Sequence, residues 1–323
     1  MPTRSSLWLL ALASVAPIVA QQAPDPNFDV SVKSPAYTAT HPRVVIDEAH
    51  HNFHTAGGRY RPFATLLRND GYDVRPGTAP FTAASLSGTA VLVISNALGE
   101  GADVGANTSP PAFTDAECLS VLAWVRGGGA LLLISDHTPM GEANTPLGKV
   151  FGVTMGRGFA FMLDPSAHRP AGLTHLVFSR ANGLLGDHPI TRGRNEAERI
   201  DTVFSFTGQS LTVPPGATPI LALGPDAWEA PTRADMQAIG AELGETTPDP
   251  ATFKTTRAIR VSERAQGLAF ESGRGRVVSL GEAALMSAQV TGPNSQGRMG
   301  MNVPGSQDKQ FALNILHWLT RLD

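Results

Sequence analysis

Histidine and acidic side chains cluster directly after the first apolar segment of the chain, Val44–Ile46. Five of the next eight residues are acidic or histidine: Asp47, Glu48, His50, His51 and His54. Imidazole and carboxylate groups hold divalent metals, and a metal-bound water needs a nearby base. We therefore interpret Asp47, His50, His51 and His54 as candidate ligands of a divalent metal, with Glu48 as the candidate base.

Two further polar groups follow apolar segments. Asp136 and His137 come directly after Leu131–Ser135, and Glu282 comes shortly after Val277–Leu280. We expect Asp136, His137 and Glu282 to be catalytic together with Glu48. A structural role for Glu282 is supported equally well: it would then be an N-cap or first-turn residue of the helical turn that follows. The histidine cluster also has a structural interpretation, because polar groups at strand ends commonly form hydrogen bonds with loop amides. The HExxH zinc pattern is absent.

The elements that must position these groups alternate along the chain. Apolar segments near residues 43–46, 72–74, 90–95 and 130–135 predict strands, with helices predicted between them. Thr114 and Glu117 form a capping box at the start of one helix, which ends at Gly127–Gly129. This alternation predicts an α/β fold with a mostly parallel sheet and helices on both faces. Parallel strands would bring the polar groups to one edge of the sheet.

The middle of the chain is less regular. Residues 156–271 contain short apolar segments separated by Pro and Gly, which we interpret as a β-rich extension with an insertion around residues 200–265. Gly267–Glu271 and Arg276–Leu280 predict a hairpin. An apolar stripe that includes Phe311, Ile315 and Leu319 predicts a closing helix from about Asp308.

The N-terminal segment has the pattern of a secretory signal. Arg4 precedes an apolar stretch from Leu7 to Ala20, which is short for a membrane span and ends in small residues. We expect residues 1–20 to be a signal peptide, residues 21–40 an N-terminal arm and residues 41–323 a single domain. The expected location is secreted or periplasmic, and an uncleaved anchor is the alternative. No later stretch predicts a membrane helix.

Composition narrows the function classes. The formal net charge is −3, which gives no basic face for nucleic acid. Cys118 is the single cysteine, so an internal disulfide and a thiolate metal site are both excluded. It falls in the first turn of the capped helix, where packing explains it better than catalysis. No GxSxG elbow occurs, and Ser135 beside Asp136–His137 lacks its glycines.

Taken together, these segments resemble the class I glutamine amidotransferase-like superfamily, especially exported bacterial members related to trehalose-utilisation-type and intraflagellar-transport-type domains. The segments that carry the resemblance are Val44–Asn52, Gly128–His137, Gly186–Gly193, Gly273–Ala284 and Gln310–Leu319. The resemblance implies a flavodoxin-like fold across most of the chain.

The same resemblance argues against glutamine hydrolysis. The family's reaction needs a cysteine on the elbow after a central strand, with His and Glu partners near the C-terminal end. Here Asp136 and His137 follow the corresponding strand, and Cys118 lies one strand upstream. The scaffold is therefore expected without the amidotransferase nucleophile.

Three function classes remain open. The preferred one is an exported hydrolase that acts at the His- and Asp-rich strand ends, with or without a divalent metal, on a small molecule or saccharide. The second is a non-catalytic module that binds a saccharide or another envelope component through the same polar edge. The third is a protein-interaction scaffold, as the transport-type relatives suggest. The clustering of the histidines at the strand ends favours the hydrolase.

Overall fold

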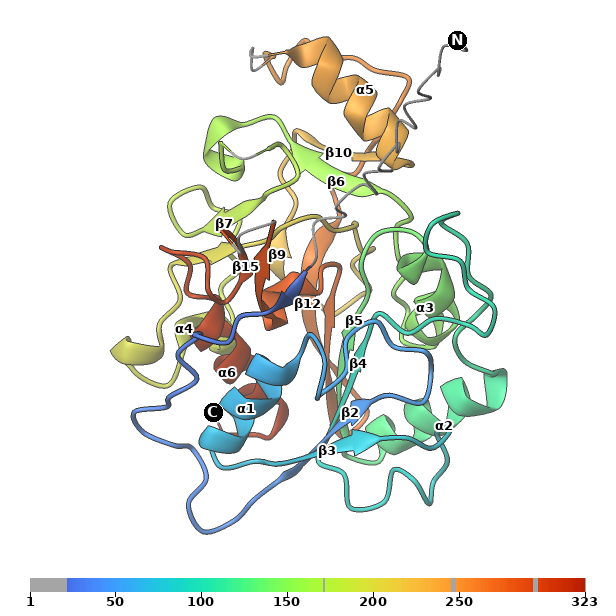
Figure 1. Cartoon of the computed structure of the whole chain (residues 1–323), viewed down its shortest axis with the longest axis vertical. Helices are drawn as coiled ribbons and strands as arrows, with labels where there is room; N and C mark the ends of the chain where they lie inside the picture. The colour runs from blue at the N-terminus through green and yellow to red at the C-terminus, as the bar shows by residue number, and fades with distance from the viewer. Residues whose placement is uncertain (1–21, 171, 245–247, 293–295, 323) are drawn as a thin grey trace, which may run out of the picture.

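A seven-stranded sheet forms the centre of the computed structural model, which describes residues 22–170, 172–244, 248–292 and 296–322 (Figure 1). The strand order is β3-β2-β4-β5-β13-β12-β9. The strands are β2 (Arg43–Asp47), β3 (Asp73–Gly77), β4 (Val91–Ser95), β5 (Ala130–Ile134), β9 (Thr218–Ala222), β12 (Ala265–Ser272) and β13 (Gly275–Leu280).

Five neighbouring strands of this sheet are parallel. Strand β2 pairs with both β3 and β4, β4 pairs with β5, and β5 pairs with β13. In chain order this is 2-1-3-4-5, the order of flavodoxin-like sheets. Every residue of β4 and β5 is buried, as expected for parallel strands that are covered on both faces. Strands β12 and β9 extend the sheet in antiparallel pairing, and β12 and β13 form the predicted hairpin.

Helices cover both faces of the sheet. On one face lie α1 (Arg61–Asn69) and α6 (Asp308–Leu319); on the other lie α2 (Asp115–Arg126) and α3 (Met140–Val150) (Figure 1). The side chains of successive residues in each strand point to opposite faces of the sheet. Leu132 and Ile134 belong to the cluster under α1 and α6, whereas Leu131 and Leu133 belong to the cluster under α2 and α3.

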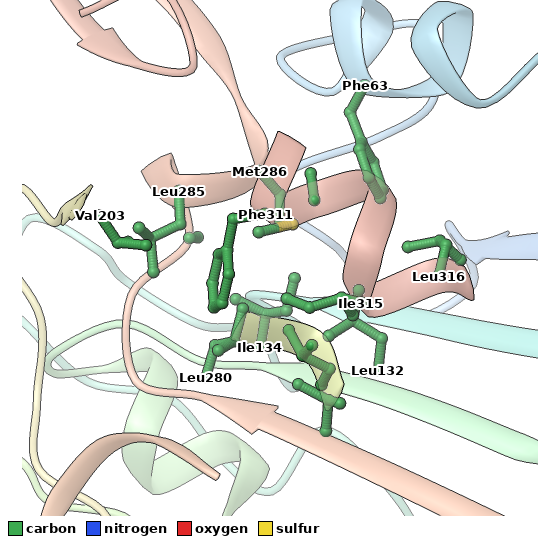
Figure 2. Packing of buried hydrophobic residues seen from close by; sticks show 14 of the residues in the cluster. Phe63, Leu132, Ile134, Val203, Leu280, Leu285, Met286, Phe311, Ile315 and Leu316 are labelled. Carbon is green, nitrogen blue, oxygen red and sulfur yellow. The ribbon is translucent and has the colours of Figure 1, made fainter. Parts of the chain in front are cut away.

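The core beneath α6 shows this packing closely. Phe311, Ile315 and Leu316 of α6 lie against apolar side chains of the sheet, and Phe63 of α1 joins them (Figure 2). These four side chains are fully buried. The predicted stripe of the closing helix is confirmed, and burial extends to most of its other residues as well.

Local signals explain most helix and strand ends. The capping box at α2 is confirmed, since Thr114 accepts a hydrogen bond from the Glu117 amide and the Glu117 side chain bonds the Thr114 amide. Strand β3 begins at Asp73 and continues through Pro76 to Gly77, beyond the predicted segment at residues 72–74. Proline is tolerated there because β3 is an edge strand.

Residues 156–264 hold most of the smaller elements. A three-stranded sheet is formed by β6 (Phe159–Met162), β10 (Ala227–Ala230) and β11 (Ile259–Arg260), with α5 (Arg233–Leu243) beside it (Figure 1). Strands β7 (Val177–Ser179) and β8 (Thr202–Phe204) pair with each other, and the short helix α4 (Pro189–Arg192) lies between them in the chain. The predicted insertion around residues 200–265 includes β9, which is a strand of the central sheet.

The described part of the N-terminal arm pairs with the rest of the domain. Strand β1 (Ala23–Pro24) joins β14 (Ala288–Thr291), which pairs in turn with β15 (Gly297–Gly300). The side chain of Asp25 accepts hydrogen bonds from Arg298 and Asn302. The expected signal peptide, residues 1–20, lies outside the described residues. Within the described ranges, none of the helices has the length and apolar character needed to cross a bilayer.

Candidate functional site

Polar side chains gather where the parallel strands of the central sheet end. Asp47 is the last residue of β2, Asn96 directly follows β4, and Asp136 and Glu282 come two residues after β5 and β13. Because these four strands are parallel neighbours, their carboxyl ends lie side by side along one edge. This is the edge at which open α/β sheets bind ligands.

Asp136 is held by Asn96 from the neighbouring strand. Its Oδ2 accepts a hydrogen bond from Asn96 Nδ2 at 3.0 Å, and its amide donates to Asn96 Oδ1 at 2.8 Å. Its Oδ1 accepts from the Ala283 amide at 3.4 Å. Burial raises the pKa of the Asp136 carboxyl group, and the opposing effects of the His137 charge, the Asn96 side chain and the Ala283 amide are smaller. The residue as a whole is half-buried and keeps some exposed surface. A carboxyl group with a raised pKa on a partly exposed residue is suited to proton transfer.

Glu282 lies buried beside Asp136 and has a structural role. Its two oxygens accept from the amides of Ala284 at 2.7 Å and Leu285 at 2.9 Å, so it caps the short 3₁₀ helix η3 (Ala284–Met286). Burial raises its pKa well above the usual value, and the negative charge of Asp136 adds to this effect. Glu282 thus holds the first two amides of η3 from the position before the N-cap, which is Ala283. The same position also makes it an electrostatic neighbour of Asp136.

A buried hydroxyl chain connects the strand ends beneath the two carboxyl groups. Ser95, at the end of β4, donates to the Tyr60 hydroxyl at 2.9 Å, and Tyr60 donates to the Ala283 carbonyl at 2.8 Å. Burial raises the pKa of Tyr60 well above its usual value, so the phenol stays protonated. This chain links the start of α1 to the turn that carries Glu282.

A loop after β8 crosses the ends of β5 and β13. Gln209 donates from Nε2 to the Ser135 carbonyl at 2.8 Å and from its amide to the Gly281 carbonyl at 2.9 Å. The loop approaches so closely that a Cβ on Gly208 would lie 2.4 Å from the Gly281 oxygen. The backbone directly before Asp136 and directly before Glu282 is thereby fixed.

His137 lies next to Asp136 in the chain and is half-buried. Its ring stacks on Phe159 of β6 with 4.3 Å between centroids, and its Nδ1 lies 2.9 Å from the Thr138 carbonyl. With Nδ1 as the donor of that bond, the neutral ring presents Nε2 as an acceptor. Asp136 and His137 are therefore the two predicted catalytic residues that the structure places together with part of their surface exposed.

His50 is enclosed between two carboxylates. Its Nδ1 lies 2.9 Å from both oxygens of Asp47, and its Nε2 lies 2.9 Å from Glu117 Oε1. Burial opposes protonation, but the hydrogen bonds and charges of Asp47 and Glu117 outweigh it and raise the pKa of His50. Asp47 also accepts from the Ala49 amide and from Asn52. This Asp47–His50–Glu117 clamp joins the loop after β2 to the start of α2.

The other residues of the histidine cluster point to different surroundings. His51 is exposed and has a φ of 47°. His54 is buried against the Tyr60 ring, and burial together with the charge of Arg59 lowers its pKa to about 3. Glu48 accepts from the Ala56 amide at 2.8 Å.

The predicted metal-ligand set is consequently not assembled. Across the described ranges, no three His, Cys, Asp or Glu side chains lie in an arrangement that could hold a metal ion. Both nitrogens of His50 are occupied, His51 faces solvent and His54 packs into the core, so these three imidazoles do not converge with Asp47. Glu48 was predicted to be the base for a metal-bound water; in the structure its carboxylate accepts a hydrogen bond from the Ala56 amide.

The nucleophile candidates are also accounted for. Cys118 is buried, and burial followed by the charges of Asp115 and Glu117 raises the pKa of its thiol to about 11. Ser135 is fully buried. Among the described non-glycine residues, positive φ angles occur at His51, Asn96, Asn107 and Arg321. Asp136 and His137 are therefore not on the strained turn that presents a nucleophile in elbow-type hydrolases.

Several site residues were not predicted from the sequence. Asn96 carries a usable signal, since it directly follows a buried strand and asparagine favours the left-handed turn seen there. Tyr60 has no sequence signal for a polar role, and Glu117 was predicted only as part of the capping box. Gln209 has no local signal, because its contacts are set by the fold.

Comparison with known proteins shows likeness in structure and none in sequence. No protein-family model matches the chain, and no curated protein matches it. The N-terminal domain of mmIFT52 has a TM-score of 0.55 and 12% identity, with 86% of this chain and 97% of that domain covered. This likeness shows the shared fold alone.

Two bacterial structures are more distant. The cytoplasmic protein STM3548 from Salmonella typhimurium has a TM-score of 0.44 and 13% identity, covering 86% of this chain and 98% of that one. A putative ThuA-like protein from Bacteroides uniformis has a TM-score of 0.43 and 12% identity, covering 88% and 94%.

Proposed function

We propose that this protein is a hydrolase whose reaction takes place at the carboxyl edge of the central sheet, with Asp136 as the general acid–base. One observation carries the proposal. Of the three strand-end carboxyl groups, Asp47 and Glu282 are buried and bonded to backbone amides, whereas Asp136 keeps exposed surface and has a raised pKa.

The two neighbouring carboxyl groups have different surroundings. Both oxygens of Glu282 accept from backbone amides and the residue is buried, whereas Asp136 keeps exposed surface, so Asp136 is the member of the pair that can exchange a proton with a substrate. In hydrolysis, ionised Asp136 would take a proton from the attacking water, and the protonated acid would return it to the leaving oxygen. His137 would orient the water or the leaving group.

The surroundings favour a hydroxyl-rich substrate such as a saccharide. The Asn96–Asp136 pair supplies planar hydrogen-bonding groups, and the half-buried His137 ring, stacked on Phe159, supplies a flat face. Such combinations of planar polar groups and ring faces suit sugars, which have many hydroxyl groups and apolar C–H faces.

We place the chain with the exported amidotransferase-like proteins that lack glutaminase activity. The strand order and the likeness to the mmIFT52 domain support the scaffold. The burial of Cys118 in α2 supports the loss of glutaminase chemistry. The signal pattern of residues 1–20 supports a secreted or periplasmic location.

The alternative is a saccharide-binding module without catalysis. The same Asn96–Asp136 pair and ring face would bind the ligand, and the two reciprocal hydrogen bonds that fix Asp136 against Asn96 suit a rigid binding group.

The discriminating experiment compares turnover and binding in one pair of variants. The wild type would be screened with p-nitrophenyl glycosides and esters, with and without EDTA, and then compared with Asp136→Asn. Asp164→Asn is the matched control, because Asp164 is an exposed aspartate whose carboxylate accepts a local amide. We expect Asp136→Asn to lose about 100-fold or more in kcat/KM and the control to keep full activity.

Other outcomes separate the two functions. Full turnover by Asp136→Asn would overturn the acid–base assignment. Saccharide binding that Asp136→Asn abolishes, with no turnover of any substrate by the wild type, would establish the binding module instead. Loss of activity with EDTA that is restored by a divalent metal would show that the reaction depends on a metal.

A further inference from the structure

A cavity lies beside the last turn of α6, at the end of that helix that is farther from the candidate site. Helix α6 starts near the candidate site, where Asp308 contributes to the raised pKa of Glu282. Its last turn lies beside the start of β13, where Arg276 donates to the Trp318 carbonyl at 2.6 Å. The cavity, of about 240 Å³, is formed between that last turn and the segment around α4.

The walls of this cavity are mostly apolar. Pro189 of α4, Trp318 of α6 and Leu322 after it provide the apolar surface. For scale, an engineered apolar cavity of about 150 Å³ accepts benzene. A volume of about 240 Å³ therefore accommodates one aromatic ring with a polar substituent.

Two arginines line the same cavity, and their pairings differ. Arg194 is held by Glu198 through several hydrogen bonds, including Nε to Oε2 at 2.9 Å. Arg192 pairs with Asp187 at 2.8 Å, but their side chains are 51% and 70% exposed. Such an exposed pair contributes little to stability, so Arg192 can exchange Asp187 for another anion. Arg192 is therefore the arginine that can form an ion pair with a bound anion.

His317 lines the cavity as well and is only partly satisfied. Its Nε2 lies 2.7 Å from Asp70 Oδ2, and both side chains are buried. Its Nδ1 is buried with no hydrogen-bond partner among the described residues. Because this nitrogen has almost no exposed surface, His317 contributes part of the cavity wall and is not assigned a hydrogen bond to the ligand.

The C-terminal end of α6 would repel a bound anion, but Arg276 and Thr320 form hydrogen bonds with its last carbonyls and reduce that repulsion. The last carbonyls of a helix carry partial negative charge. Here Arg276 bonds the Trp318 carbonyl, and its guanidinium lies 4.8 Å from the centre of the Trp318 ring. The Thr320 hydroxyl donates to the Leu316 carbonyl at 2.7 Å. The helix end is thus capped, and Arg276 adds a positive charge behind the tryptophan.

We propose that this cavity binds a small aromatic carboxylate, with the ring against Trp318 and the carboxylate on Arg192. The site is separate from the proposed hydrolytic edge and does not depend on it. Both parts of the ligand are needed: the ring for the apolar walls and the negative charge for the arginine.

The test uses benzoate as the probe, with benzyl alcohol as the neutral ring and acetate as the ringless anion. Binding to the whole protein would be followed by saturation-transfer NMR and by the fluorescence of its tryptophans. We expect saturable binding of benzoate, weaker binding of benzyl alcohol and none of acetate.

Matched variants assign the binding to this cavity. Arg192→Ala should weaken benzoate about tenfold, the effect of losing one hydrogen bond to a charged group. Arg199→Ala is the control, since Arg199 is equally exposed and paired with Asp201 but does not line the cavity. Leu322→Trp should abolish binding by filling the space. Absence of saturable benzoate binding, or equal losses in Arg192→Ala and Arg199→Ala, would overturn the proposal. Asp136→Asn should leave benzoate binding unchanged.

Discussion

Asn96 and Asp136 hold each other through two reciprocal hydrogen bonds across the ends of β4 and β5. The side-chain amide of Asn96 donates to the Asp136 carboxylate at 3.0 Å, and the Asp136 amide donates to the Asn96 side-chain oxygen at 2.8 Å. Asn96 can do this because its backbone adopts a φ of 47°, in the left-handed region. The orientation of the proposed catalytic carboxyl group therefore depends on one unusual backbone position.

A pair of substitutions at Asn96 separates the backbone effect from the side-chain effect. Both Asn96→Ala and Asn96→Gly remove the hydrogen bonds, and we expect both to raise the pKa of Asp136 further. Alanine should cost about 1 kcal/mol more in the free energy of unfolding, because only glycine adopts this φ without strain. Urea denaturation would measure the difference. Equal stability of the two variants would refute the strain argument.

The Asp47–His50–Glu117 clamp predicts a pH-dependent stability. The pKa of His50 is raised in the folded state, so its contribution is complete below about 6.5, the unfolded value, and is lost as the pH rises through the folded pKa. The pKa of Glu117 is lowered to about 2, mainly because hydrogen bonds from Thr114, His50 and Phe81 together outweigh the opposing effect of burial. Its contribution is complete above about 4.5 and is lost as the pH falls toward 2.

Urea denaturation between pH 3 and pH 9 tests this clamp. The wild type should be most stabilised by it between about pH 4.5 and 6.5, and His50→Gln should lose the alkaline slope. Removing the imidazole leaves two carboxylates without their shared partner, which we expect to cost about 3 kcal/mol at pH 6. His41→Gln is the control, since His41 is exposed and bonds one backbone carbonyl. Parallel pH profiles for wild type and His50→Gln would contradict the assignment.

The core beneath α6 predicts a large effect from a single truncation. Phe311 is fully buried against the central sheet, so Phe311→Ala should lower the free energy of unfolding by about 3–5 kcal/mol. Leu119→Ala on α2 is the comparison, because Leu119 is 59% exposed and should change stability by less than about 0.5 kcal/mol. Thermal melting monitored by circular dichroism would measure both. Similar melting temperatures for the two variants would exclude this packing.

Cys118 should be unreactive in the folded protein. Its thiol is buried, and burial together with the nearby carboxylates raises its pKa to about 11, so little thiolate is present at pH 8. Labelling with a thiol-specific chromogenic disulfide should therefore be slow in buffer and immediate in denaturant. Rapid labelling of the folded protein would show that the first turn of α2 is more open than described.

The sheet could be predicted from the sequence because its signals are local. Continuous apolar segments predicted β4 and β5 almost to the residue, and the Thr114–Glu117 capping box fixed the start of α2. The sequence placed Glu282 at this edge only on the condition that its strand lay beside the others, and β13 does pair with β5 in the structure. These inferences need only the side-chain pattern of each segment and the geometry of parallel strands.

The arrangement of the histidines could not be predicted in the same way. His50, His51 and His54 follow β2 in a loop, where spacing does not determine the direction of a side chain. The partner of His50 is Glu117, 67 residues away, and His54 is buried because Tyr60 provides a ring to pack on. Such contacts are determined by tertiary packing, so a cluster in the sequence was separated in space.

The link between Asp136 and Ala283 spans 147 positions of the chain. During synthesis or translocation from the N-terminus, β2 to β5 emerge as an incomplete sheet with an uncovered edge at β5. Neither β13 nor α6 can cover that sheet until the last fifty residues have arrived. Leu132 and Ile134 therefore lack their final cover while the intervening segment is made, which leaves that part of the sheet exposed to non-native contacts.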